Sequence, residues 1–117
     1  MIRRSPTQAT GDAAEDRALA FLAGRGLCLV ERNVSSRLGE IDLVMRDGDA
    51  VVFVEVRSRA RSDYGGAAAS VGPAKQRRLR LEAQRFLVAR FGDRWPACRF
   101  DVCAIDGAAI DWIRDAF

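Results

Sequence analysis

The sequence predicts an α/β domain in which a mixed central sheet is flanked by helices. Apolar segments at 39–45 and 51–57 enclose a short polar turn at 46–49, as in a β-hairpin. Both segments are nearly apolar throughout, which indicates that both faces of their sheet are covered. One helical pattern precedes the hairpin and another follows it. The predicted order is therefore helix, strand, strand, strand, helix, strand, an αβββαβ core.

The first third of the chain predicts a tail, a helix and a strand. Residues 1–10 are polar and contain Pro6, so we expect a flexible N-terminal tail followed by a single domain over 11–117. Residues 11–25 predict a helix that ends near Gly26. Its apolar stripe consists of Ala14, Ala18, Leu19, Phe21 and Leu22. Residues 27–34 predict the first strand.

The second half predicts a loop, a helix and a strand. Residues 58–72 are rich in glycine without a consistent period, and we expect a mobile loop. Pro73 suits the first turn of a helix over 73–91, whose surface is basic. Its apolar line is Leu79, Ala83, Phe86 and Leu87. Residues 98–105 predict the fourth strand, and a turn at Asp106-Gly107 leads to a short final segment, 108–113.

The composition narrows the classes of function. The net charge of +3, from 19 basic and 16 acidic residues, supports a polyanionic partner only weakly. Lys75 is the only lysine, and the other 18 basic residues are arginine. No histidine is present, which excludes histidine bases and histidine metal ligands. We expect the three cysteines, Cys28, Cys98 and Cys103, to be reduced packing residues.

Nothing in the sequence predicts a membrane protein. No apolar run approaches the length of a membrane span, and the first residues are not followed by the apolar segment of a signal peptide. We therefore expect no membrane partner and a cytoplasmic location.

Acidic residues interrupt both strands of the hairpin. A two-residue turn at Asp47-Gly48 would place Glu40 opposite Glu55. Asp42 and Glu55 would then be diagonal neighbours about 7–8 Å apart, on one face with Glu40 and Arg57. The other face would be wholly apolar and packed under a helix. It would carry Ile41, Leu43, Met45, Val52, Val54 and Val56.

Buried carboxylates are costly unless a partner compensates their charge. Two flexible carboxylates at this separation can converge on one cation, and like charges facing each other favour such binding. With hard oxygen ligands and no histidine, Mg²⁺ or Mn²⁺ is favoured over Zn²⁺.

The hairpin strings Gly39-Glu40-Ile41-Asp42-Leu43-Val44 and Val52-Phe53-Val54-Glu55-Val56-Arg57 resemble those of the YraN family of bacterial proteins. Weaker matches are Arg32-Asn33, the string from Lys75 to Leu79, and the string from Arg99 to Val102. The element order resembles the restriction-endonuclease-like PD-(D/E)xK nuclease fold and is similar to the core of archaeal Holliday-junction resolvases.

The resemblance implies roles for particular residues. Asp42 and Glu55 match the two metal-binding carboxylates, and Glu15 matches a first-helix glutamate that assists them. Arg57 occupies the place of the motif's lysine; arginine stays protonated, so it can hold a phosphate but cannot transfer a proton. Candidate nucleic-acid contacts are Arg57, Arg59, Lys75, Gln76 and Arg78.

Each assignment has a structural alternative. Asp42 and Glu55 could form a structural site with Arg57 and Arg37, and Arg57 could be only their counter-ion. Glu15 could be an exposed helix charge. The basic helix and its Gln76 could be an ordinary solvated surface, and we expect Asp101 to be solvated or structural rather than a metal ligand.

Three functions remain open from the sequence. The first is a metal-dependent nuclease-like protein that binds and hydrolyses DNA, with branched or junction DNA as a candidate substrate and a homodimer as the form that would cut two strands. The second is a nucleic-acid-binding module without catalysis on the same fold. The third is a protein-interaction subunit in which the carboxylates are relics.

Overall fold

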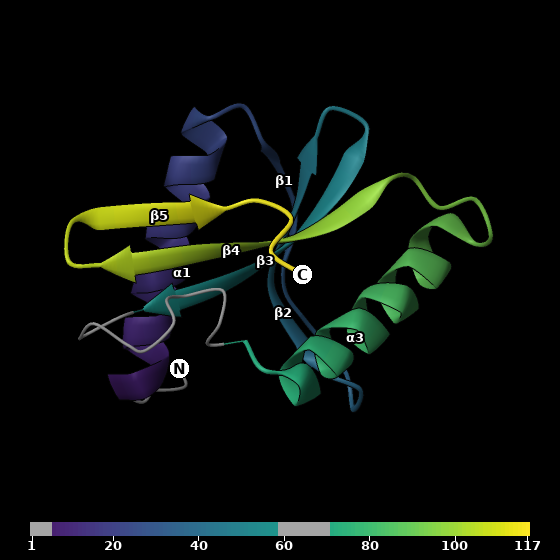
Figure 1. Cartoon of the computed structure of the whole chain (residues 1–117), viewed down its shortest axis with the longest axis horizontal. Helices are drawn as coiled ribbons and strands as arrows, with labels where there is room; N and C mark the ends of the chain where they lie inside the picture. Colours follow the sequence, from purple (N-terminus) through teal and green to yellow (C-terminus); the bar gives the residue numbers. More distant parts are fainter. Residues whose placement is uncertain (1–5, 59–70) are drawn as a thin grey trace, which may run out of the picture.

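The computed structural model describes residues 6–58 and 71–117, and within them five strands form one sheet (Figure 1). The strands are β1 (Cys28–Ser35), β2 (Glu40–Asp47), β3 (Ala50–Ser58), β4 (Cys98–Asp106) and β5 (Ala109–Ile113). They lie side by side in chain order. The pair β3–β4 is parallel and the other neighbours are antiparallel, which confirms the predicted mixed sheet.

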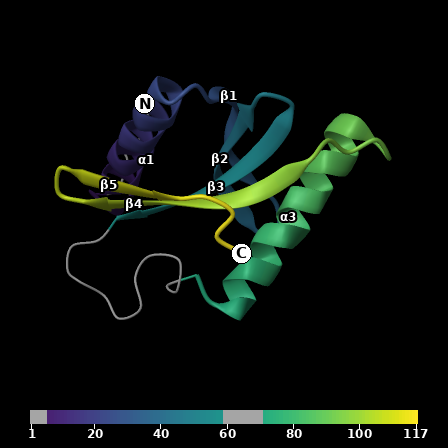
Figure 2. The ribbon, with the colours of Figure 1, turned by 45° about the horizontal axis from the view of Figure 1, so that its top comes forward.

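Two helices cover the two faces of this sheet (Figure 2). Helix α1 (Pro6–Gly24) packs Ala18 and Leu22 against a cluster that includes Leu43. Helix α3 (Pro73–Phe91) packs Leu79 and Phe86 on the opposite face. The central strands are apolar on both sides because both sides are covered. No helix in the described ranges is long and apolar enough to cross a membrane.

The helix boundaries correct one prediction and confirm another. Residues 6–10, which we expected to be part of a flexible tail, belong to α1, which begins at Pro6. Proline is favoured at the first helical position, where its missing N–H is not needed. Helix α3 spans Pro73–Phe91 as predicted. The mobile loop expected over 58–72 falls almost wholly outside the described residues, which resume at residue 71.

The final segment forms a fifth strand that the sequence pattern did not predict as such. Strand β5 pairs with β4 through a turn in which Gly107 has a φ of 59°. Trp112 packs against the core cluster under α1, and Ile113 and Phe117 pack against the cluster under α3. These apolar residues therefore cover the core of a single chain, and the expected homodimer stays a prediction.

The alternation of side chains breaks where β1 and β2 approach their ends. Asn33 has a left-handed backbone, with a φ of 53°. On either side of it, Arg32 pairs with Leu43 and Val34 pairs with Ile41. Leu43 packs in the cluster under α1, whereas Ile41 packs in the cluster under α3. The prediction that Ile41 shares a face with Leu43 is therefore wrong, because a left-handed residue in the neighbouring strand interrupts the regular pleat.

Candidate active site

The hairpin register brings the two central carboxylates closer than the sequence suggested. Strands β2 and β3 pair Asp47 with Ala50 and Leu43 with Val54, so the turn consists of Gly48 and Asp49. Gly48 has a φ of 61°, which suits the first position of a two-residue hairpin turn.

The predicted turn at Asp47-Gly48 is therefore one residue too early. The pairing ends at Leu43–Val54; continued by one step, this register would bring Asp42 level with Glu55 rather than diagonal to it. Moving the turn by one residue shifts the pairing of the two strands by two residues. Because two is an even number, the shift does not change the face on which Glu55 points.

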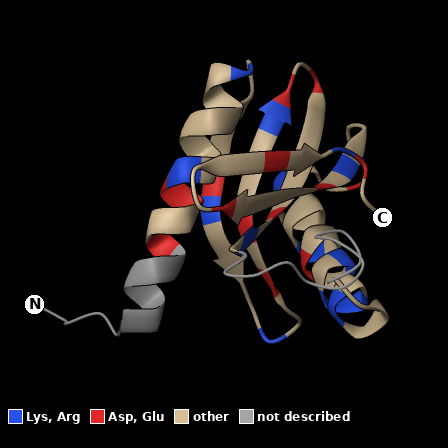
Figure 3. Cartoon of the chain, turned by 60° about the vertical axis from the view of Figure 1, so that its left-hand side comes forward, with Lys and Arg blue, Asp and Glu red and all other residues tan. Residues whose placement is uncertain are grey.

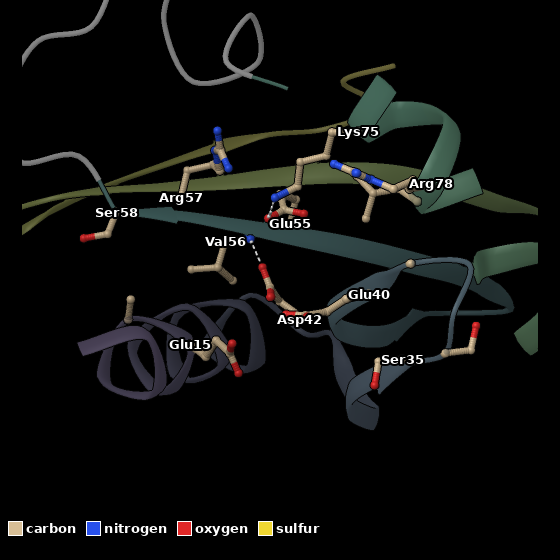
Figure 4. Close-up of a pocket in the computed structure, with 14 residues that line it drawn as sticks. Glu15, Ser35, Glu40, Asp42, Glu55, Val56, Arg57, Ser58, Lys75 and Arg78 are labelled. Carbon is tan, nitrogen blue, oxygen red and sulfur yellow. Dashed lines mark hydrogen bonds and ion pairs between the residues drawn. The ribbon is translucent and has the colours of Figure 1, made fainter. Parts of the chain in front are cut away.

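A pocket of about 720 Å³ lies where β2, β3, α1 and the first turns of α3 meet (Figure 4). Its charged lining combines carboxylates with cations. The carboxylates are Glu15, Glu40, Asp42 and Glu55, and the cations are Arg57, Lys75 and Arg78. Ala14, Ser35, Ser36, Gly39, Val56, Ser58 and Leu79 complete the lining. The pocket is thus polar, and its charged residues, of both signs, come from four separate elements.

Glu55 is the most constrained of these carboxylates. It is only 6% exposed, and its Oε1 lies 3.1 Å from Nζ of Lys75 on α3. Burial, and then the nearby charge of Asp42, raise the pKa of Glu55 to about 7, although Lys75 opposes this rise. A carboxyl group that titrates near neutral pH in an open pocket is a candidate for function.

Asp42 is fixed by the backbone of the facing strand. Its Oδ2 accepts a hydrogen bond of 2.8 Å from the backbone N–H of Val56 (Figure 4). This bond holds the carboxylate at the end of the hairpin, between Glu55 on β3 and Glu15 on α1. Asp42 lies between the two β1–β2 pairs that flank Asn33, where the alternation of side chains breaks. The direction of its side chain therefore depends on this break.

Glu15 is buried, which excludes the alternative that it is an exposed helix charge. It is 9% exposed, and its Oε1 lies 3.5 Å from Nη2 of Arg32. At that distance the contact is an ion pair, and this buried oxygen has no hydrogen-bond partner within the described residues. Burial, followed by the charge of Asp42, raises the pKa of Glu15. The site thus holds a buried carboxylate oxygen that is ion-paired with Arg32 but accepts no hydrogen bond from the described residues.

The wall of the pocket formed by the β1–β2 loop is supported by α3. The hydroxyl of Ser36 donates a hydrogen bond to the fully buried carboxylate of Glu82. Arg85 donates to the same carboxylate through Nε, at 2.8 Å. A Cβ atom at Gly39 would lie 2.5 Å from the carbonyl oxygen of Arg78, so this loop rests directly on the helix backbone.

Most of the predicted site residues come together. Glu15, Asp42, Glu55, Arg57, Lys75 and Arg78 all line the pocket. Figure 4 shows the Lys75 ammonium directed at Glu55, while the Arg57 side chain points away from Asp42 and Glu15. Gln76 is not among the lining residues; its side chain donates a hydrogen bond of 2.9 Å to the carbonyl oxygen of Val71. Arg59 lies outside the described residues.

Sequence reasoning missed the ion pair between Lys75 and Glu55, and the supporting role of Glu82. Both had a signal. Lys75 is the only lysine in an arginine-rich chain. Glu82 interrupts the apolar line of α3, since it stands three residues after Leu79 and four before Phe86.

The donor set of the pocket fits a hard divalent cation. Carboxylate oxygens are the ligands that Mg²⁺ and Mn²⁺ prefer, and Oε1 of Glu15 is a buried acceptor that receives no hydrogen bond from the described residues. As the side chains stand, no group of three or more acidic or cysteine residues in the described ranges is arranged to hold a metal ion. Binding would therefore use Asp42 and Glu55 after a side-chain movement that includes Lys75.

Fold and pocket together define an α/β protein with a polar site of carboxylates and cations at one end of its central hairpin. Residues 14–105 match the family described as "Uncharacterised protein family UPF0102". The chain belongs to this family, which is the one that the hairpin strings indicated.

The relatives match along almost their whole length. The chain is 64% identical over 115 residues to a UPF0102 protein of Ralstonia pickettii (strain 12J), covering 95% of this chain and 91% of that protein. It is 62% identical over 113 residues to one of Ralstonia nicotianae, covering 93% and 86%. It is 52% identical over 116 residues to one of Herminiimonas arsenicoxydans, covering 97% and 90%.

Proposed function

We propose that this protein is a metal-dependent phosphodiesterase that acts on nucleic acid, with DNA as its first substrate. One observation carries the proposal. A single pocket brings Asp42 and Glu55 together with Glu15, whose buried Oε1 accepts no hydrogen bond from the described residues, and with three cationic side chains. Carboxylates for a divalent cation, next to cations for a phosphate, are the two requirements of metal-assisted phosphodiester hydrolysis.

The carboxylates have separable roles in this proposal. Asp42 and Glu55 would hold Mg²⁺ or Mn²⁺, because both line the pocket from adjacent strands and Asp42 is fixed by the backbone of β3. Glu15 approaches from α1, and its Oε1, which accepts no hydrogen bond from the described residues, can orient a water molecule or complete the ligand set. When bound, the metal ion polarises the phosphate and lowers the pKa of water.

The cations bind and orient the substrate. Arg57 and Arg78 line the pocket from β3 and α3, where guanidinium groups can hold phosphate oxygens through two hydrogen bonds. Lys75 supplies a compact ammonium next to Glu55. Arg57 occupies the position at which the nuclease motif carries its lysine. In this proposal the lysine of the site therefore comes from α3 instead of β3.

The charge distribution supports a polyanionic substrate. Basic positions gather along α3, whose first turns form one wall of the pocket (Figure 3). They are Lys75, Arg77, Arg78, Arg80, Arg85 and Arg90. A nucleic-acid backbone that follows this helix would pass its phosphates over the carboxylates.

A cleavage assay tests the proposal. The purified protein is incubated with linear duplex, single-stranded, flap and four-way-junction DNA in Mg²⁺ and then in Mn²⁺. The test variant is Asp42→Asn, which retains an oxygen acceptor for the Val56 N–H but removes the charge. The matched control is Asp93→Asn, at an exposed position just after the C-terminal end of α3.

We expect wild type and the control to cut and Asp42→Asn not to cut. Equal cutting by wild type and Asp42→Asn would assign the activity to a contaminant and reject the site. Preference for the junction would point to action on two strands, and the mass of the protein in solution would then show whether a homodimer supplies two sites.

A second candidate is a nucleic-acid-binding module without catalysis. The observation that favours it is the ion pair between Lys75 and Glu55, which compensates a buried carboxylate without any metal. DNA retention without cleavage in either metal would support this candidate. Failure both to bind and to cut nucleic acid would leave the protein-interaction subunit.

A further inference from the structure

We propose that Lys75 competes with the divalent cation for Glu55, and that a nucleic-acid phosphate releases Glu55 to the metal by binding the Lys75 ammonium. The inference rests on the proposed function and adds a coupling between its two ligands. In this scheme the metal loads poorly until substrate arrives. The carboxylate, the ammonium and the phosphate exchange partners without any covalent step.

The geometry places Lys75 on one of the two metal-binding carboxylates. Its Nζ lies 3.1 Å from Oε1 of Glu55, within ion-pair distance. A metal ion bound by this carboxylate would lie close to the ammonium, and the two cations would repel each other in a partly buried site. The ammonium therefore opposes metal binding at Glu55, and its departure favours it.

The two partners differ in their freedom to move. Glu55 lies in the centre of the sheet on β3 and its side chain is 6% exposed, whereas the Lys75 side chain is 37% exposed. A flexible four-carbon stem lets the ammonium swing towards solvent without moving the backbone. In Figure 4 the Lys75 side chain lies between those of Arg57 and Arg78, with its ammonium at Glu55.

The position of Lys75 in its helix argues against a role in stabilising α3. Lys75 is in the first turn, two residues after Pro73, and the first turn contains no acidic residue. The helix dipole disfavours a cation at this end. A lysine here, in a chain whose other basic residues are all arginine, is explained by what the ammonium contacts across the pocket.

A competition of this kind couples two ligands. Phosphate binding that draws away the ammonium raises metal affinity, and metal binding must raise phosphate affinity by the same factor. Removing the ammonium should uncouple the two ligands. The metal would bind more tightly to the protein without nucleic acid, and added nucleic acid would raise the metal affinity by a smaller factor.

The test measures Mn²⁺ binding by calorimetry in the absence of nucleic acid. We expect Lys75→Gln to bind Mn²⁺ about tenfold more tightly than wild type, within the usual range of coupling between sites. Lys75→Arg keeps the charge on Glu55, so its affinity should equal or fall below that of wild type. Arg77→Gln, an exposed charge removed from the same helix, is the matched control and should change affinity less than twofold.

The phosphate arm uses a fluorescent single-stranded oligonucleotide, whose dissociation constant is measured with and without Mn²⁺. Direct contacts between metal and phosphate act in every variant, so the Mn²⁺-dependent tightening is compared between proteins. We expect a larger tightening in wild type than in Lys75→Gln. Equal tightening in both would reject the handover of Glu55.

The outcomes separate this inference from the proposed function. Mn²⁺ binding by wild type with equal or weaker binding by Lys75→Gln would overturn the competition and leave the metal site intact. Mn²⁺ binding that survives in Asp42→Asn would overturn the metal site itself. No Mn²⁺ binding by either wild type or Lys75→Gln would overturn both. Binding by Lys75→Gln alone would support the competition in its strongest form.

Discussion

The hydroxyl of Ser36 donates a hydrogen bond to the carboxylate of Glu82, so the β1–β2 loop is tied to the middle of α3. Glu82 is fully buried and also accepts hydrogen bonds from Arg85. This loop forms the wall of the pocket as far as Glu40, where β2, the strand that holds Asp42, begins. A buried charge on the helix therefore positions residues of the site without lining it.

Replacing Glu82 with alanine should destabilise the protein by about 1–3 kcal/mol, because a buried hydrogen-bonded group is removed and its donors lose their acceptor. Glu82→Gln should cost less, since its amide oxygen can still accept from Ser36. Urea denaturation of both variants measures the difference. An alanine variant as stable as wild type would show that the loop is held by other contacts.

Gly39 is a second position in the same pocket wall at which a substitution should destabilise the protein. A Cβ atom there would lie 2.5 Å from the carbonyl oxygen of Arg78, and backbone cannot rotate away as a side chain can. Gly39→Ala should therefore push the loop off α3 and cost about 1–3 kcal/mol. Gly24→Ala is the control, since a Cβ at Gly24 meets nothing within 4 Å. Thermal unfolding should show a lower midpoint for Gly39→Ala only.

The fold was predictable because its signals are local. The hairpin is apolar on both faces, which required helices on both sides, and Pro73 placed the start of α3. The register was not predictable from the hairpin alone. Asp47-Gly48 and Gly48-Asp49 are both acceptable two-residue turns, and the choice between them depends on packing of the whole strand pair.

The candidate site was predictable as a set of residues but not as a set of contacts. Acidic residues in apolar strands identified Asp42 and Glu55 from the sequence, and both line the pocket. The ion pair of Glu55 with Lys75 joins elements separated by a crossover, so no local pattern specifies it. The left-handed Asn33 likewise changes the face of Ile41 through a neighbouring strand.

Asp101 is a buried carboxylate with a structural role, and its loss should leave the metal site unaffected. It accepts hydrogen bonds from Nε1 of Trp112 and the backbone N–H of Asp115, both at 2.9 Å, and it pairs with Arg99. Asp101→Ala would leave these donors without their acceptor, and we expect a loss of about 1–3 kcal/mol. Unfolding followed by tryptophan fluorescence measures it.

Asp111→Asn, at an exposed position on β5, is the control for Asp101→Ala and should unfold like wild type. In the milder Asp101→Asn, Mn²⁺ affinity should equal that of wild type. A large change in Mn²⁺ affinity there would contradict the separation of structural and functional carboxylates.

Asp42→Asn should lower the pKa of Glu55 from about 7, because it removes the charge of the neighbouring carboxylate. The value should stay above the ordinary 4.5, since burial of Glu55 is the larger cause and is unchanged. Carbon-detected NMR titration of the glutamate carboxyl groups follows this group directly. Asp93→Asn, at an exposed position just after the C-terminal end of α3, should leave the Glu55 titration where it is in wild type.

The same shift makes stability depend on pH in a defined direction. The pKa of Glu55 is raised from 4.5 to about 7 in the folded protein, so between these values the folded state binds more protons than the unfolded state. The contribution of Glu55 to the free energy of unfolding therefore declines as pH rises through this window, and it stays low above it. Glu55→Gln should flatten this part of the profile. Added Mg²⁺ should stabilise wild type more above pH 7 than below it, because protons and the metal compete for Glu55. A stabilisation by Mg²⁺ that is independent of pH would show that the metal does not bind Glu55.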